Sequence, residues 1–404
     1  MTLKKLSILW SLAIASIGYV QGQYSFKEHY FKRNGGDSKN FVQIEGFYGL
    51  NSTAITNAMS NKLYFGGFID DEIKSSSYDR ITSLNQLGFD FQAGIQYKRK
   101  LDKFTFTAGI DQSVQGGAQF SKNLYELIFY GNEPYAGQNM TLTNTEARIY
   151  GFRTYSLGFE KDINSIFFGA SINLYQGTYF YETNVERGTL YTNGDGSGIT
   201  FDTKMDLTTN YFPSEFSPGA GLDFHIIRKY EKGMAFIEVE DLGFVTYRGS
   251  SSLSADSLYS WEGLYIEDLF TGSEDVDFET DSLHQILGVE VNNGTITRWA
   301  PTRINIGIQS LIGEKILLET VANYRILPNY TPQVIVKPNY FFNKNLSIAP
   351  VVGIGGYGKL DLGLNISYHH TNYFAVLDFN EFENLISKNN TSGRNVFLKI
   401  GYLF

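Results

Sequence analysis

The clearest signal along this chain is a period-two alternation of apolar and polar residues, which recurs from about residue 87 to residue 404. Successive side chains of a β-strand point to opposite faces, so the alternation predicts strands with one apolar face. The first run has Leu87, Phe89, Phe91, Ala93, Ile95 and Tyr97 on one face and Gly88, Asp90, Gln92, Gly94 and Gln96 on the other. The second face is small and polar throughout these runs.

The runs are roughly 10 to 15 residues long, whereas strands in soluble proteins average ~5–6 residues. A tilted strand that crosses a bilayer needs ~9–11. Tight polar turns alternate with long connections, and aromatic residues recur at strand ends, as in the girdles of membrane barrels. These patterns predict an all-β fold, a transmembrane antiparallel β-barrel with long extracellular loops. An extracellular soluble β-sandwich is the alternative.

Parity limits the number of strands, because both ends of a bacterial barrel normally lie on the same side of the membrane. Only one of the segments 41–49 and 62–68 can then be a wall strand. The segment 176–212 must cross an even number of times, as a wall hairpin or as a hairpin in an outer loop. We expect about 14 strands, with 16 as the alternative.

The composition removes several classes of protein. Aromatic residues make up 16% of the chain, yet hydrophobic residues reach only 42% and the mean hydropathy is −0.20. A polytopic helical membrane protein would be far more apolar. The chain has no cysteine, which excludes disulfides and thiol chemistry. The net charge of −9 argues against a nucleic-acid partner.

The N-terminus has the pattern of an export signal. Lys4 and Lys5 precede an apolar run at 6–20, and Val20-Gln21-Gly22 supplies small residues for cleavage. We therefore expect a signal peptide at 1–22, an N-terminal plug or first-strand segment at 23–61 and the barrel at 62–404.

The alternation also predicts which charged residues face the lumen. It places Asp223 and His225 on the inward face of one strand, and Glu238 and Glu240 on that of the next. A barrel lumen is wet and polar. The group could line a conduction path or select cations, and it could equally brace the wall.

The long connections contain other candidates. Residues 123–130 and 261–270 are compatible with helices, and Leu264, Ile266, Leu269 and Phe270 could constrict the mouth. Residues 274–281 form an acidic stretch that is expected to be solvated. We find no catalytic arrangement, no metal site and no cofactor motif, so we do not expect an enzyme.

The last strand carries a candidate barrel-assembly signal. Leu398, Ile400 and Tyr402 alternate with polar residues and lead to the terminal Phe404. A terminal aromatic residue on such a strand resembles the signal that the outer-membrane assembly machinery reads, although Gly401 is displaced from its usual place.

Three segments resemble uncharacterised outer-membrane barrels of the Bacteroidetes type: 216–223 (FSPGAGLD), 240–247 (EDLGFVTY) and 259–270. Such proteins are distantly similar to long-chain fatty-acid channels and to barrels associated with type IX secretion. The resemblance implies an outer-membrane location and about 14 strands. It supplies no catalytic residues.

Two functions follow as hypotheses. The first is a transport channel in the bacterial outer membrane for a small or hydrophobic solute. The alternative is a non-conducting scaffold or secretion-accessory protein that binds an envelope or secretion partner. Outer-membrane lipid and, during biogenesis, the barrel-assembly machinery are the other expected partners.

Overall fold

The computed structural model describes residues 39–211, 215–262, 289–380 and 391–404. The expected signal peptide and the first part of the expected plug lie outside these residues. So do most of the possible helix at 261–270 and the whole acidic stretch at 274–281.

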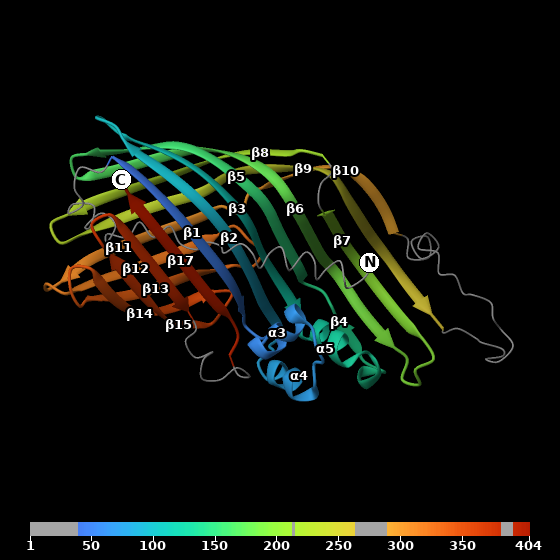
Figure 1. Cartoon of the computed structure of the whole chain (residues 1–404). Coiled ribbons are helices and arrows are strands. Elements are labelled where there is room, and N and C mark those ends of the chain that lie inside the picture. The colour runs from blue at the N-terminus through green and yellow to red at the C-terminus, as the bar shows by residue number, and fades with distance from the viewer. Residues whose placement is uncertain (1–38, 212–214, 263–288, 381–390) are drawn as a thin grey trace.

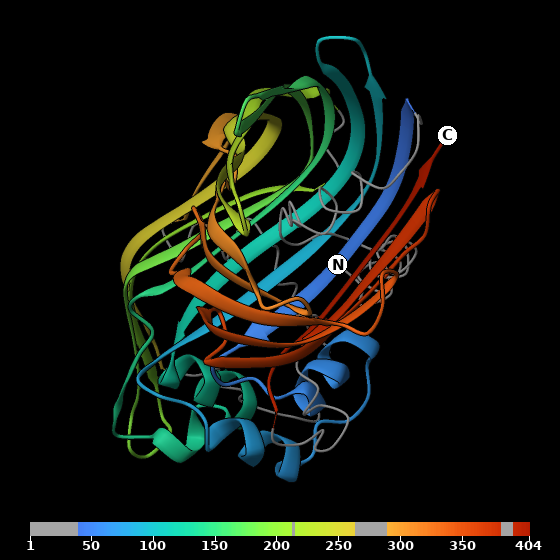
Figure 2. The same cartoon turned by 90° about the vertical axis from the view of Figure 1, so that its left-hand side faces the viewer.

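The described chain forms one antiparallel sheet that closes on itself into a barrel (Figures 1 and 2). The ring closes where β1 pairs with both β2 and β17. Its wall contains fourteen strands within the described residues. They are β1 (Asn40–Ser52), β2 (Leu84–Lys100), β3 (Thr105–Ser121), β5 (Thr145–Ile163), β6 (Ile166–Thr192), β8 (Ser217–Tyr230), β9 (Gly233–Trp261), β11 (Arg303–Ile312), β12 (Ile316–Arg325), β13 (Thr331–Phe341), β14 (Leu346–Gly356), β15 (Leu360–His369), β16 (Tyr373–Asn380) and β17 (Arg394–Leu403).

The predicted fold and the preferred number of strands are confirmed, and the sandwich alternative is wrong. Of the two candidate first strands, 41–49 lies in β1, while 62–68 contains the end of a helix. The barrel wall therefore begins at Asn40, within the expected plug or first-strand segment at 23–61. Asn40 and Phe404 exchange two backbone hydrogen bonds of 3.0 Å, so the first and last strands end together.

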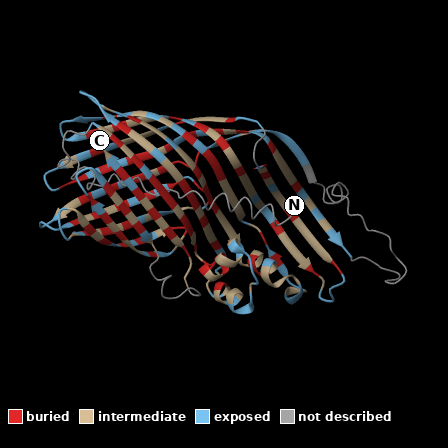
Figure 3. Ribbon diagram, viewed as in Figure 1, coloured by how far each residue is buried: buried red, intermediate tan, exposed pale blue. Residues whose placement is uncertain are grey.

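Burial alternates along the wall strands as the sequence pattern predicts (Figure 3). Outward-facing aliphatic residues are exposed, including Ile44 at 61%, Ile172 at 62% and Ile354 at 62%. Their inward-facing neighbours are polar and buried. This inside-out distribution is that of a barrel whose exterior faces lipid.

Aromatic residues are exposed on the outer face beside the short turns. This set comprises Phe104, Phe106, Phe159, Tyr230, Tyr340, Phe342, Tyr368, Tyr373, Tyr402 and Phe404. Such a band matches the interfacial girdle of a membrane barrel.

Among the described residues, no helix has the length and hydropathy needed to span a membrane.

The two ends of the barrel differ. Short turns, such as that between Ile163 and Ile166, lie at the end that holds Asn40 and Phe404, which we call the short-turn end. At the other end, the long-loop end, β6 and β9 continue past the wall. There they pair with β7 (Ile199–Tyr211), β4 (Asn139–Thr141) and β10 (Val289–Trp299), forming a projecting sheet. The segment 176–212 is therefore an outer-loop hairpin.

Helices cover part of the long-loop end (Figure 1). They are α3 (Asn57–Phe65), α4 (Asp71–Tyr78), α5 (Lys122–Tyr130) and the short η1 (Glu133–Tyr135). Thr56, Asp70 and Ser121 cap the N-termini of α3, α4 and α5 through their side-chain oxygens. Met59 and Tyr125 form the core of this helical cap. The predicted helix at 123–130 is confirmed.

Candidate functional site

The lumen holds many buried polar side chains beside two apolar clusters, one around Phe41 and Phe374 and one around Ile227 and Met234. Near the short-turn end three buried lysines pair with carboxylates of nearby strands. Lys98 Nζ lies 2.7 Å from Glu160 Oε1, and Lys399 Nζ lies 3.4 Å from Glu45 Oε2. Lys337 lies 3.8 Å from Glu319 and 3.6 Å from Asp378. We call these pairs the wall braces.

The wall braces connect strands that are close in the ring. Glu45 and Lys399 are direct partners on β1 and β17, and Glu319 and Lys337 are direct partners on β12 and β13. Lys98 on β2 reaches Glu160 on β5 across one intervening strand. Lys337 on β13 also reaches Asp378 on β16 across two intervening strands. None of these contacts joins opposite sides of the ring.

A second set of ion pairs lies further toward the long-loop end and does cross it. Arg325, the last residue of β12, pairs with Asp90 on β2. Six strands separate β12 from β2 in either direction around the ring: β3, β5, β6, β8, β9 and β11 one way, and β13 to β17 and β1 the other. The two side chains therefore join opposite walls across the lumen at this level.

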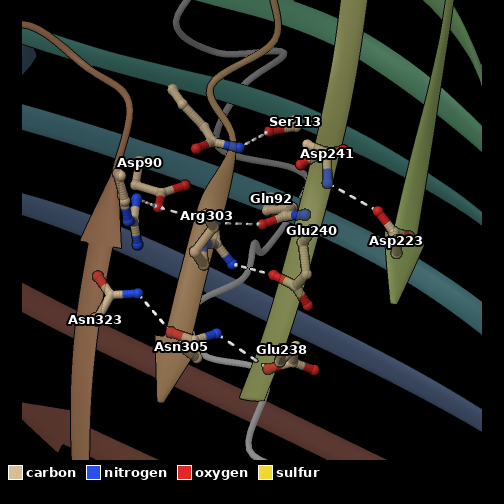
Figure 4. A network of polar contacts seen from close by, with 12 residues as sticks. Asp90, Gln92, Ser113, Asp223, Glu238, Glu240, Asp241, Arg303, Asn305 and Asn323 are labelled. Carbon is tan, nitrogen blue, oxygen red and sulfur yellow. Dashed lines mark hydrogen bonds and ion pairs between the residues drawn. The ribbon is translucent and has the colours of Figure 1, made fainter. Parts of the chain in front are cut away.

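Arg303 also connects the two sides of the lumen. Its side chain is 1% exposed, and its guanidinium lies 3.1 Å from Glu240 Oε2 and 3.8 Å from Asp90 Oδ2 (Figure 4). It also donates to Gln92 Oε1 at 3.5 Å. A single guanidinium thus links β9 and β11 to β2. We call Asp90, Arg303 and Arg325 the cross-lumen bridge.

A β-bulge turns one more carboxylate, that of Asp241, into the lumen near Glu240. Asp241 has a φ of 56°, and the register of β8 against β9 shifts between Leu222 and Phe224. Consecutive residues Glu240 and Asp241 therefore both turn inward, because a bulge interrupts the alternation of side chains. Tyr175 Oη donates to Asp241 Oδ1 at 3.1 Å.

Asp223 holds this bulge in place. Its carboxylate accepts hydrogen bonds from the backbone N–H of Asp241 at 2.8 Å, from Asn173 at 2.7 Å and from Ser171 at 2.9 Å. Three donors fix both of its oxygens against the wall. The contacts of Asp223 are therefore those of a bracing residue, and it lies beside the cross-lumen bridge rather than in it.

Glu238 begins a hydrogen-bonded chain along the wall. Asn305 donates to Glu238 Oε2 at 3.0 Å, and Asn323 donates to Asn305 Oδ1 at 2.6 Å (Figure 4). Tyr330 Oη in turn donates to Asn323 Oδ1 at 2.6 Å. Arg325 stacks over the Tyr330 ring, 5.7 Å from its centroid, so the chain of hydrogen bonds leads to the cross-lumen bridge.

His225 faces the lumen but is packed differently from the other three predicted residues. Its ring stacks on Phe167, with centroids 5.5 Å apart and planes at 18°. Gly169 makes room for this ring, because a Cβ there would overlap it. The structure therefore brings Asp223, Glu238 and Glu240 into one network and places His225 in a neighbouring aromatic contact.

Toward the long-loop end, the lumen becomes aromatic. The buried cluster there comprises Tyr150, Phe152, Tyr175, Phe180, Val245, Tyr247, Ala300, Leu327 and Tyr357. Its rings pack edge to face or tilted, as Phe152 does against Tyr175 at 5.2 Å. Tyr330 contacts this cluster through Tyr357, with ring centroids 5.2 Å apart.

A cavity of about 50 Å³ lies beside these aromatic rings. The cross-lumen bridge forms part of its lining through Asp90 and Arg325. The other lining residues are aromatic, amide-bearing or glycine: Phe47, Gly49, Asn51, Gly88, Phe89, Tyr330, Gln333, Gly356, Tyr357, Asn380 and Asn395. The site therefore combines ring faces and amides with one ion pair.

The residues that join opposite walls of the lumen carry no local signal of their pairing in the sequence. Asp90 and Gln92 had been placed on a polar face, but nothing marked them as partners of β11 and β12. Arg303 also alternates with the exposed residues Ile306 and Ile308, so its inward direction was readable from the pattern. Among the described residues, no group of three or more acidic or histidine side chains could hold a metal ion.

The last strand presents its apolar residues outward. Ile400, Tyr402 and Phe404 are 50%, 52% and 53% exposed, and Tyr402 stacks on Phe404 with centroids 5.9 Å apart. Leu398 lies on the same face and is half-buried. Their recognition by an assembly machinery stays a prediction.

The sequence model of a family of unknown function (DUF5723) matches residues 34–378. No curated protein matches the chain by sequence. Similar solved structures include the Pseudomonas putida toluene transporter TodX, at 11% identity and a TM-score of 0.46, covering 96% of this chain and 95% of that one. A Pseudomonas aeruginosa FadL homologue has 9% identity and a TM-score of 0.44, covering 90% of each chain. At this level of likeness, these proteins say nothing about the solute or mechanism of this chain.

Proposed function

Because the chain belongs to this family of unknown function, as the resemblance to uncharacterised barrels anticipated, its activity must be read from its own geometry. We propose that it is a channel of the bacterial outer membrane that admits a small solute through a gated lumen. The observation that carries the proposal is the cross-lumen bridge beside an aromatic and amide-lined cavity.

The location is supported by the outer surface of the barrel. Its exposed aliphatic band and its aromatic residues beside the short turns suit a lipid environment. Barrels of the bacterial outer membrane have short turns in the periplasm and longer loops outside. On that basis, Asn40 and Phe404 face the periplasm, and the cavity faces the cell exterior.

A gate is supported by the way in which the lumen is closed. Barrels of 16–18 strands leave an aqueous channel, whereas about eight strands leave room only for side chains. A wall of fourteen strands is therefore wide enough to conduct, and side chains rather than the wall close it. Ion pairs between side chains can separate without breaking the sheet, as a gate requires.

The lining of the cavity supports a solute with an apolar body and a polar or anionic end. Phe47, Tyr330 and Tyr357 offer ring surface, and Asn395 offers an amide. Arg325 could attract an anionic group that competes with Asp90 for its guanidinium. Since about 50 Å³ holds only a few water molecules, such a solute would enter as the bridge opens.

The test measures solute flux into liposomes that contain the purified barrel. Wild-type protein should admit a small aromatic carboxylate slowly but faster than protein-free liposomes do. Phe47→Ala, which widens the cavity, should raise this flux several-fold. Ile44→Ala, on the outer face of the same strand, is the matched control and should leave it unchanged. A fourth protein lacks residues 23–39, part of the segment expected to plug the lumen. If liposomes stay sealed with wild type, with both substituted proteins and with this deletion variant, the protein is not a channel.

The alternative function is a non-conducting scaffold for an envelope or secretion protein. It is favoured by the filled lumen and by the sheet of β4, β6, β7, β9 and β10 that projects past the wall. A scaffold should retain a protein partner during isolation in mild detergent. Isolation as a lone monomer, together with solute flux, would exclude this alternative.

A further inference from the structure

Apolar side chains are exposed on the helical cap as well as on the barrel wall. At the end of α3 and just after it, Leu63 is 55% exposed, Phe65 is 70% exposed and Phe68 is 81% exposed. Exposed rings of this size are costly in water, and a cluster of them usually marks a contact surface. The cap has its own core around Met59 and Tyr125, so these three residues are not needed to fill it.

The backbone holds these side chains outward. Helix α3 ends at Gly66, whose φ is +80°, and Gly67 follows with a φ of +120°. Both values lie in the left-handed region that favours glycine. This pair of glycines ends the helix and separates Phe65 from Phe68, and we call residues 63–68 the tip.

Contacts made by Arg394 place this tip beside the outer face of the wall. Arg394 lies on the outward face of β17, because its neighbour Asn395 points into the lumen cavity. Its guanidinium lies 5.8 Å from the ring centroid of Tyr48, an outward residue of β1, and 5.9 Å from that of Tyr64 on α3. Arg394 also donates to Asn61 Oδ1 at 2.5 Å.

The exposed tip is therefore continuous with the lipid-facing surface. Tyr48 packs edge to face against Phe89 of β2, with centroids 6.2 Å apart. Tyr64, one residue before Phe65, is joined to Tyr48 through Arg394. The tip thus extends the outer surface at the seam where β17 meets β1.

We propose that Leu63, Phe65 and Phe68 insert into the outer leaflet of the membrane as an interfacial anchor, and that lipid is their partner. Lys62, in the last turn of α3, suits the anionic headgroup level next to them. The anchor holds the helical cap against the bilayer and shields the closing seam of the barrel. The inference rests on the membrane location proposed above but not on transport.

The absence of cysteine allows a direct test, because a single introduced cysteine takes a nitroxide label at one place only. The variants are Phe68→Cys, Ile44→Cys as a reference on the lipid-facing wall, and Asp71→Cys as a matched control on the cap, where the side chain is 96% exposed. Each is reconstituted in liposomes. Collisions of the label with oxygen, which is enriched in lipid, are compared with those of a water-soluble nickel chelate.

The anchor predicts that the label at 68 collides more with oxygen than with the chelate, as at 44, while the label at 71 shows the opposite ratio. A label at 68 that behaves like that at 71, with 44 in lipid, overturns the anchor and leaves the barrel location intact. A water-exposed label at 44 would instead overturn the membrane location itself. The heat-dependent shift in electrophoretic mobility of each variant shows that its barrel is folded.

Discussion

The wall braces join strands that are neighbours or near neighbours, whereas the cross-lumen bridge joins strands from opposite sides of the ring. Both sets are buried pairs of a basic side chain with a carboxylate, and their exposures are similarly low. Their chemistry is therefore nearly the same, and only their place in the ring differs. A pair such as Lys98 and Glu160 can stabilise the wall, but only a pair such as Arg325 and Asp90 can block the lumen. The following predictions test this division.

The largest expected effect is on conductance. Arg325→Ala removes the contact between β12 and β2, so single-channel conductance in planar bilayers should rise several-fold over wild type. Lys98→Met removes an equally buried cation from a wall brace and should leave conductance unchanged. If both variants fold and have the same conductance, then the position of an ion pair in the ring does not decide whether it blocks the lumen.

The largest effect on stability should come from a wall brace. Glu160→Leu leaves Lys98 buried without its carboxylate, which costs about 3–5 kcal/mol in the free energy of unfolding. The double variant Lys98→Met/Glu160→Leu should recover much of that loss, because the buried ammonium is then removed together with its carboxylate. Urea unfolding in lipid measures both. A double variant as unstable as the single one would mean that packing, rather than charge, explains the loss.

A smaller loss should follow from crowding the aromatic side of the lumen. A Cβ on Gly88 would overlap the ring of Tyr357, the residue that follows the end of β14. Gly88→Ala should therefore displace this ring and cost about 1–3 kcal/mol, the usual range for overpacking. Adding Tyr357→Ala should remove the crowding. If the second substitution destabilises the Gly88→Ala variant further, the overlap is not the cause.

The smallest effect should come from Tyr330→Phe. It deletes the hydrogen bond to Asn323 but keeps the ring beneath Arg325. We expect a loss of about 0.5–1.5 kcal/mol and no change in conductance. An increase in conductance would show that the hydroxyl, and not only the ring, holds the bridge closed.

Much of the fold was readable from the sequence. Strict alternation assigned a face to residues such as Ile400 and Glu238, because a strand has only two faces. Parity then left fourteen or sixteen strands, with fourteen preferred, and residues 123–130 in a long connection were compatible with a helix. Local patterns carried these results, since each depends on residues close together in the chain.

The arrangement of the site depended on contacts between distant residues. Asp241 turns inward only because a bulge interrupts the alternation, and Asp223 fixes that bulge from another strand. No local pattern distinguishes the segment 62–68, a helix end held against β17, from a wall strand. Above all, alternation says that Asp90 and Arg325 face inward but not that they meet. Apart from bulge positions such as Asp241, the sequence alone thus determined which side chains enter the lumen. Only closure of the barrel decided which opposite walls they join, because that depends on how fourteen strands are placed around one ring.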